Sequence, residues 1–186
     1  NPAQIKRETA VKLYNTPTSP YGRKVLITAI EKGLDKKVEV LPARTPEAEL
    51  HKKNPLDKLP VLVTDDGEVV IESSLICEYL DEIGSGPKLF PTEAKARRKI
   101  VQAQAIAQGV LDAVVLLRME ERRKPEERSQ DWIVRQQKKV DRGVPFMESL
   151  LAALPGEISA PHITFACCLW FMDKHNIGSD WRKTSP

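Results

Sequence analysis

The apolar positions divide the chain into an early part that predicts strands and helices and a later part that predicts helices only. In residues 11–83 the apolar runs are short and end at turn residues, whereas after residue 92 they recur at helical spacing. Strands followed by helices are typical of an α+β architecture with two packed domains. We therefore expect one domain at 10–83 and an all-helical domain at 92–186, joined by a linker at 84–91.

The early part predicts the element order strand, helix, strand, helix, strand, strand, helix. The sequence Asp65-Asp66-Gly67 between two β-rich runs indicates a hairpin, because Asp-Gly suits the left-handed backbone of a tight turn. The expected elements are a strand at 11–15, a helix carrying Val25, Leu26, Ala29, Ile30 and Leu34 that ends near Gly33, a strand at 38–41, a short helix opening at 45–47, strands at 60–64 and 68–71, and a helix carrying Leu75, Ile76, Tyr79, Leu80 and Ile83.

The later part predicts three helices of unequal length. We expect them at about 92–121, 126–154 and 163–175. Gly143 and Pro145 lie inside the second helix and are expected to kink or break it. Its expected anchors in the core are Trp132, Ile133, Val140, Val144, Phe146 and Leu150.

Composition and charge exclude several classes of protein. The 29 basic and 26 acidic residues give a net charge of +3, which is too small and too mixed for a nucleic-acid-binding surface. No uninterrupted apolar run approaches the ~20 residues of a membrane helix, so no membrane partner is expected. The polar start of the chain does not indicate secretion, and three cysteines do not form an even disulfide framework. We expect a cytoplasmic protein.

Three short motifs carry a resemblance to a known family. Residues 19–25 read SPYGRKV, residues 54–62 read NPLDKLPVL and residues 72–80 read ESSLICEYL. They resemble the S-P-x-x-R-K-V, N-P-x-G-K-x-P-x-L and E-S-x-x-I-x-x-Y-L patterns of soluble glutathione S-transferases, in the right order and spacing. The similarity is closest to bacterial-type members with a serine in the first turn. It implies a thioredoxin-like N-terminal domain of order β-α-β-α-β-β-α, followed by an all-helical C-terminal domain.

The chain departs from the family pattern at three places. Asp57 stands where glycine is usual, and His162 stands where the late helix usually has aspartate in its capping box. The sequence ends at Pro186, where the family normally continues into another helix, so we expect the last helix to be missing.

The resemblance implies that Ser19 stabilises the thiolate of bound glutathione. A free thiol with a pKa of ~8.5 is only about 3% ionised at pH 7, so its nucleophilic form needs selective stabilisation. Ser19 stands at the mouth of the helix that opens near Pro20 and could donate a hydrogen bond to the sulfur. The same residue is equally well placed to be only the helix cap. The rival hydroxyl groups are those of Thr16, Thr18 and Tyr14.

Two further motifs are implied to hold the glutathione backbone. Leu59-Pro60 resembles the cis-proline dipeptide of thioredoxin-like folds, whose preceding residue pairs with the cysteinyl backbone; an ordinary trans proline at a strand start is the alternative. Glu72 suits the ammonium group of the γ-glutamyl residue. The hydroxyl and N–H groups of Ser73 suit its carboxylate, because a helix N-terminus attracts anions. The alternative is that Glu72 and Ser73 only cap the helix that follows the strand and bind no ligand.

The charged and sulfur-containing residues are less specific. Arg44 and Lys58 are candidates for the glycyl carboxylate, although each could equally be a solvated surface charge. Cys77 falls on an apolar helix stripe and is expected in the core. The spacing of the other cysteines and histidines is not that of a metal site, and we expect no metal. Those residues are Cys167, Cys168, His162 and His175.

The resemblance implies a glutathione transferase of the detoxification type. It would use glutathione as co-substrate and transfer the thiolate to an electrophilic, hydrophobic small molecule bound between the two halves. Peroxide reduction and thiol exchange need the same thiolate and remain open. A homodimer is implied as well. The alternative is a non-catalytic member of the fold that serves as an interaction or regulatory protein, because fold does not fix function.

Overall fold

The structure is a computed structural model that describes residues 11–154, 156–178 and 180–184. It consists of two compact units that divide between Pro87 and Lys88. The first ten residues, including the expected domain start at residue 10, lie outside the described part. Each unit is treated separately below.

The first unit is built on a four-stranded sheet with the order β2-β1-β3-β4. The strands are β1 (Val11–Asn15), β2 (Val38–Pro42), β3 (Val61–Val63) and β4 (Val69–Ile71). β1 runs parallel to β2 and antiparallel to β3, which is antiparallel to β4. The predicted hairpin is confirmed: Thr64 N–H donates to the carbonyl of Glu68 at 2.9 Å, and Gly67 adopts a φ of 91°. This sheet is the thioredoxin-like arrangement that the resemblance implies.

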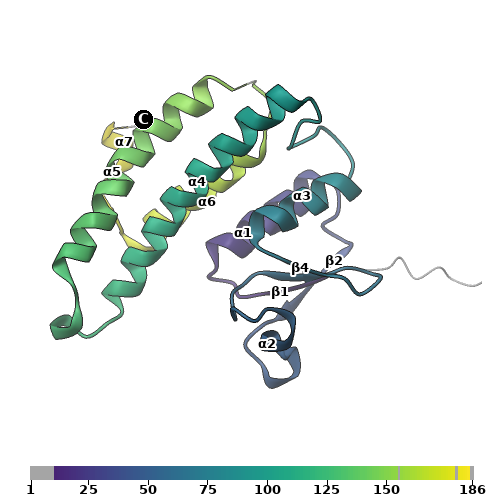
Figure 1. Cartoon of the computed structure of the whole chain (residues 1–186), viewed down its shortest axis with the longest axis horizontal. Coiled ribbons are helices and arrows are strands. Elements are labelled where there is room, and N and C mark those ends of the chain that lie inside the picture. The colour runs from purple at the N-terminus through teal and green to yellow at the C-terminus, as the bar shows by residue number, and fades with distance from the viewer. Residues whose placement is uncertain (1–10, 155, 179, 185–186) are drawn as a thin grey trace, which may run out of the picture. The chain divides into compact units, whose positions relative to one another are not determined.

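Helices cover the sheet as the sequence predicts. α1 (Pro20–Glu31) and α3 (Ser73–Ile83) pack against each other on one face, and the short α2 (Leu50–Lys53) lies beyond the other (Figure 1). A 3-10 turn at Pro46–Ala48 precedes α2. The core between α1, α3 and the sheet holds fully buried side chains of Leu13, Val25, Leu62, Ile76 and Leu80.

Three apolar residues that the helical pattern places in the core are exposed instead. Ile30 is 61% exposed, and Leu75 and Ile83 are each about half exposed. The reason is geometric: α1 and α3 each have only the sheet and the other helix to pack against within the unit, so one side of each helix has no neighbour there.

A buried ion pair closes the end of the first unit. The ammonium of Lys32, fully buried just after α1, lies 3.0 Å from the carboxylate of Asp81 in α3. It also donates to the carbonyls of Gly86 and Pro87, at 3.3 and 2.7 Å. Since buried charges are tolerated only when they are paired and hydrogen-bonded, this lysine fixes the chain where the unit ends.

The second unit is helical, with α4 (Ala94–Glu121) as its central element. α5 (Gln130–Ala152) and α6 (Ala160–His175) both pack on α4, and a short α7 (Trp181–Thr184) follows (Figure 1). By length and mean hydropathy alone, α4 is long and apolar enough to cross a membrane. The sequence did not indicate this, because polar residues interrupt its apolar runs. Half of that apolar window is buried inside the protein, as in the core helix of a helical unit.

The second helix differs from its prediction in two respects. It begins at Gln130 rather than near residue 126, because Ser129 caps it by accepting from the N–H of Trp132 at 3.3 Å. Residues 125–127 form a separate 3-10 turn. α5 then continues unbroken through Gly143 and Pro145 to Ala152.

Of the six predicted anchors of this helix, Val140 and Val144 are buried and Ile133 and Leu150 are half-buried. The other two are exposed: Trp132 is 38% exposed and Phe146 50%. The buried positions share the side that faces α4, and they are the predicted Val140 and Val144 together with Gln136 and Met147.

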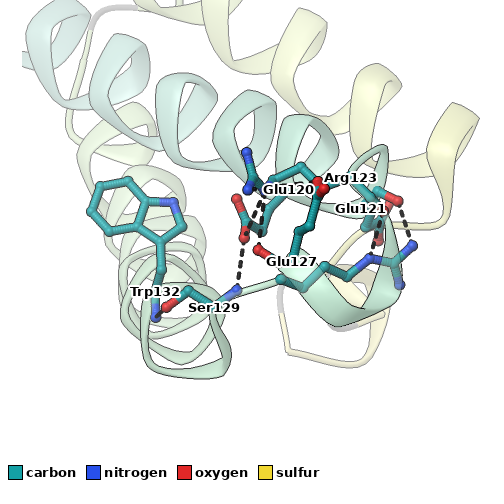
Figure 2. Close-up of polar contacts among 7 residues, drawn as sticks. Glu120, Glu121, Arg123, Glu127, Ser129 and Trp132 are labelled. Carbon is teal, nitrogen blue, oxygen red and sulfur yellow. Dashed lines mark hydrogen bonds and ion pairs between the residues drawn. The ribbon is translucent and has the colours of Figure 1, made fainter.

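Polar contacts organise the connection between α4 and α5. Figure 2 shows Glu120 accepting from the N–H of Ser129 at 2.8 Å, with Arg123 3.7 Å from the same carboxylate. The guanidinium of Arg128 donates to the carbonyl of Glu121 at 2.7 Å and to that of Arg123 at 3.1 Å. Residues 118–128, where basic and acidic side chains alternate, therefore form a hydrogen-bonded connection between the two helices.

Candidate functional site

Ser19 is the N-cap of α1. Its hydroxyl oxygen accepts a hydrogen bond from the N–H of Gly22 at 3.1 Å, and its own N–H donates to the carbonyl of Thr16 at 3.1 Å. Among the residues that the structure describes, none accepts a bond from the Ser19 hydroxyl hydrogen. The capping bond therefore uses a lone pair of the Ser19 oxygen, and the hydroxyl hydrogen can still be donated to a ligand. Thr18 is exposed, and Thr16 is partly buried.

The first turn of α1 is packed against the end of β1. A Cβ atom at Gly22 would lie 1.8 Å from Oδ1 of Asn15, so no larger residue fits there without moving that side chain. Asn15 is 5% exposed and is the last residue of β1. This contact fixes how closely the turn that carries Ser19 packs on the end of β1.

The second motif lies beside the first across the sheet. The peptide bond between Leu59 and Pro60 is cis, as the resemblance implies. Val61, the next residue, begins β3 and pairs with Tyr14 near the end of β1. The turn that carries Ser19 follows β1 directly, so β-sheet register brings the first two motifs to the same edge of the unit.

Glu72 and Ser73 form the start of α3. Glu72 adopts a φ of 73° as the N-cap, and one carboxylate oxygen accepts from the N–H groups of Ser74 and Leu75 at 2.9 and 3.3 Å. Its other oxygen accepts from the Ser73 hydroxyl at 3.2 Å. Glu72 thus satisfies two N–H groups at this helix end, and the N–H of Ser73 is the one that it does not engage. Ser73 is buried, whereas Glu72 is exposed.

Lys24 was missed by the sequence reasoning. It is only 1% exposed, and its ammonium donates to the hydroxyl of Ser74 at 3.0 Å, which joins α1 to the first turn of α3. One turn further along α1, the hydroxyl of Thr28 donates to the sulfur of Cys77 at 3.2 Å. Lys24 and Thr28 stand four residues apart and therefore on one face of α1, but their partners in α3 are about 50 residues away and leave no signal in the spacing.

Arg44 and Lys58 differ in their surroundings. The guanidinium of Arg44 donates to the carboxylate of Asp57 at 2.8 Å and to the backbone carbonyl of Asp57 at 3.4 Å. Asp57 itself adopts a φ of 51°. Lys58 is exposed, and its backbone carbonyl accepts from the side chain of Asn54 at 2.9 Å. Asp57 and Lys58 lie in the loop that leads into Leu59, and Arg44 reaches this loop from the segment that follows β2.

The cysteines are buried thiols. Cys77 is 2% exposed, as expected of a core position, and burial raises its pKa above the usual value. Burial raises the pKa of Cys168 to about 12, and its neighbour Cys167 is buried as well. In the described ranges, no cluster of three or more His, Cys, Asp or Glu side chains could hold a metal ion.

Comparisons with known proteins agree on one family. A model of the glutathione S-transferase N-terminal domain matches residues 13–88. The uncharacterized GST-like protein YibF of Escherichia coli K12 is 28% identical over 175 residues, which cover 92% of this chain and 86% of that protein.

Solved structures give the same result with higher identity. A glutathione transferase family member from Pseudomonas fluorescens, with bound glutathione, is 33% identical and superposes with a TM-score of 0.88 over 95% of this chain and 89% of that one. A glutathione S-transferase from Methylobacillus flagellatus, also with glutathione bound, is 33% identical with a TM-score of 0.87, covering 95% and 90% of the two chains.

Proposed function

The chain belongs to the glutathione S-transferase family, and from this premise we propose that it binds glutathione, holds its thiol as a thiolate and transfers it to an electrophilic small molecule. Glutathione is present in the structures of two 33% identical relatives, which supports the first part of the proposal. The thiol proton leaves to solvent, and the sulfur forms a bond to the electrophilic carbon. In a substitution the leaving group departs with the electron pair of its bond to that carbon, and in an addition the electron pair of the broken π bond takes up a proton from solvent.

The observation that carries the proposal is the bonding of Ser19. Its oxygen accepts from Gly22 N–H at 3.1 Å, so the hydroxyl hydrogen is the part that remains to meet the glutathione sulfur. Lowering a thiol pKa by ~2 units requires roughly 2.7 kcal/mol of selective stabilisation. A hydrogen bond to a charged group contributes on the order of 1.5–3 kcal/mol, and the positive end of α1 adds about 0.3–1 kcal/mol. Together these two contributions span the required stabilisation, so the proposal needs no neighbouring base.

The other site residues are assigned to the three parts of the tripeptide. We propose that the backbone of Leu59, preceding Pro60, pairs with the cysteinyl residue. The N–H of Ser73 binds the γ-glutamyl carboxylate, and its hydroxyl turns from Glu72 to donate to the same carboxylate. The exposed carboxylate of Glu72 meets the γ-glutamyl ammonium group, while it keeps its bonds to the N–H groups of Ser74 and Leu75.

The glycyl carboxylate requires a cation near Leu59. Arg44 and Lys58 are assigned to it, because Lys58 directly precedes Leu59 in the sequence and Arg44 is bonded to the adjoining Asp57. This end of glutathione is the one that differs between glutathione and γ-glutamylcysteine, so its contribution can be measured separately.

Titration of the protein with glutathione by calorimetry tests the proposal, combined with the pH dependence of the thiolate absorbance in the complex. We expect saturable binding and a thiol pKa well below the ~8.5 of the free thiol. Binding with an unshifted thiol pKa would contradict the catalytic assignment. Absence of binding would favour the alternative of a non-catalytic interaction or regulatory protein on the same fold.

A further inference from the structure

The loop that leads to Leu59 has a shape that does not depend on the side chain of Asp57. Asn54 is 2% exposed, and its side chain accepts from the N–H of Leu56 at 3.0 Å and donates to the carbonyl of Lys58 at 2.9 Å. The N–H of Asp57 donates to the carbonyl of Asn54 at 2.9 Å. A buried amide and a backbone bond therefore already close this turn.

Asp57 nevertheless stands where glycine would be favoured. Its φ of 51° lies in the left-handed region, which costs an ordinary residue about 1–2 kcal/mol and costs glycine nothing. Aspartate is among the few residues that tolerate this region, because its short side chain can bond locally. Here, however, the carboxylate is directed to Arg44 in another segment, at 2.8 Å.

The ion pair between Asp57 and Arg44 contributes little to the stability of the fold, but it restricts the rotamers of the Arg44 side chain. Both side chains are 58% exposed, and an ion pair of this kind contributes about 0–1 kcal/mol at most. Two groups of Asp57, the carboxylate and the backbone carbonyl, hold the two terminal nitrogens of the guanidinium. An arginine side chain otherwise carries about 2 kcal/mol of rotamer entropy, and part of it is lost before any ligand arrives.

The held guanidinium keeps donors for a second carboxylate. Arginine has five N–H donors, and Asp57 uses two of them. Arg44 and Lys58 together bring two positive charges to this loop, against the one negative charge of Asp57. Asp57 lies two residues before Leu59, a chain distance of at most about 7 Å, so Arg44 is held next to the position proposed for the cysteinyl residue. Glycine is the residue that follows cysteine in glutathione.

We propose that Asp57 is a positioning residue that orders Arg44 for the glycyl carboxylate of glutathione. This inference rests on the proposed function and adds to it a residue that departs from the family pattern. The bound thiol must therefore carry a carboxylate beyond its cysteinyl residue to gain from Asp57.

The test compares two thiols in calorimetric titrations of the unsubstituted protein and of Asp57→Gly. Glutathione has the glycyl carboxylate and γ-glutamylcysteine lacks the glycyl residue. We expect the Kd for glutathione to rise about 3- to 10-fold in Asp57→Gly, the loss typical when a charge-assisted contact is no longer prearranged. The Kd for γ-glutamylcysteine should stay within error. Asp57→Asn, which keeps an oxygen acceptor and tolerates the same backbone, should recover part of the loss.

Glu49→Gly is the matched control. Glu49 also has a positive φ, of 44°, and also forms an exposed ion pair, with Lys52. Neither residue belongs to the proposed site, so Glu49→Gly should leave the Kd of both thiols unchanged.

Three results would overturn the role of Asp57. The first is an equal effect of Asp57→Gly and Glu49→Gly on the Kd for glutathione. The second is an equal rise of the Kd for both thiols in Asp57→Gly. The third is that the losses of binding free energy caused by Arg44→Met and Asp57→Gly add in full when the two are combined. If the unsubstituted protein binds glutathione in these cases, the proposed function stands and only the positioning role fails. If it binds neither thiol, the proposed function and this role fail together.

Discussion

At the scale of single residues, the helix caps of this chain hold much of its candidate chemistry. Ser19 caps α1, Glu72 caps α3 and Ser159 caps α6. A cap uses acceptor lone pairs, because it satisfies N–H groups at a helix start. A serine cap therefore retains its hydroxyl hydrogen, which is what a thiolate needs. Capping and thiolate stabilisation by Ser19, which the sequence presents as alternatives, are chemically compatible.

We predict that Ser19→Ala lowers kcat about 10- to 100-fold, the equivalent of a charge-assisted hydrogen bond, while the Kd for glutathione changes little. Of the groups of bound glutathione, the hydroxyl is proposed to contact only the sulfur, and it matters most for the ionised form; the helix-cap bond to Gly22 N–H is lost as well, which affects stability rather than the thiolate. Steady-state kinetics and the thiolate absorbance of the complex measure the two effects. Thr18→Ala is the control, since Thr18 is the exposed neighbouring hydroxyl. A larger loss in Thr18→Ala would move the catalytic role to that residue.

His162 shows how one departure from the family pattern acts on stability. α6 begins at Ala160 with Ser159 as its N-cap, three residues before the expected start at 163, so His162 is its third residue. The N–H of Ser159 donates to Nδ1 of His162 at 3.3 Å, and the Ser159 hydroxyl lies 2.9 Å from the same atom. Burial lowers the pKa of His162 below its usual 6.5. Protonation of Nδ1 would also remove the acceptor for Ser159.

Because the folded pKa lies below the unfolded pKa of ~6.5, the unfolded state binds more protons in between. The contribution of His162 to stability is therefore fully present above pH ~6.5, is lost as the pH falls through that value, and becomes constant below the folded pKa. Chemical denaturation between pH 5 and 8 should show this decrease.

We predict that His162→Asp stabilises the protein by roughly 0.5–1 kcal/mol at pH 7 and reduces the pH dependence. An aspartate can accept the Ser159 N–H bond and interacts favourably with the positive helix end. His162→Asn is the matched control: it keeps an acceptor without a charge or a titration near pH 6.5, so it should remove the pH dependence with a smaller gain. Equal unfolding of all three proteins at every pH would refute the role of the Ser159 cap.

At the scale of elements, two glycines in the second unit test how closely helices approach. A Cβ at Gly143 of α5 would lie 2.4 Å from Cγ2 of Val110 in α4, whereas a Cβ at Gly109 of α4 meets nothing within 4 Å. Valine in a helix has one strongly preferred rotamer, so Val110 cannot easily move aside. The absence of a side chain at Gly143 thus sets the distance between α4 and α5.

We predict that Gly143→Ala is less stable than Gly109→Ala by about 1–3 kcal/mol, the usual effect of overpacking. Both substitutions replace a glycine inside a helix, so the gain in helix propensity of about 1 kcal/mol is common to both and cancels in the comparison. Denaturant unfolding of the two variants measures the difference. Equal stabilities would show that α4 and α5 separate without cost at this point.

At the scale of the whole molecule, we predict a homodimer, which is the assembly implied by the family. The described part of the chain leaves large apolar side chains exposed in both units, among them Val69 and Leu75 in the first and Val101 and Phe146 in the second. Light scattering should give about twice the chain mass of 20.9 kDa at micromolar concentrations. A mass of one chain across that range would count against the dimer.

The sequence predicted the elements well where local chemistry fixes them. The Asp-Gly hairpin and the helix stop near Gly33 depend on neighbouring residues only, and the structure confirms both. The errors arise where packing decides. The start of α5 moved to Gln130 because Ser129 is the better cap, and apolar residues such as Phe146 are exposed because only one side of the helix meets α4.

The sequence by itself determined the family, the order of elements and the candidates for the glutathione site, because short motifs of fixed spacing carry all three. Only the tertiary structure decided what each candidate contacts. It joined Arg44 to Asp57, 13 residues apart, and Lys24 to Ser74, 50 residues apart. Such pairs leave no periodic signal along the chain, since they depend on the packing of α1 against α3 and on the turn that Asn54 closes. Spacing therefore predicted which groups are present, and packing determined which of their donors and acceptors remain for a ligand.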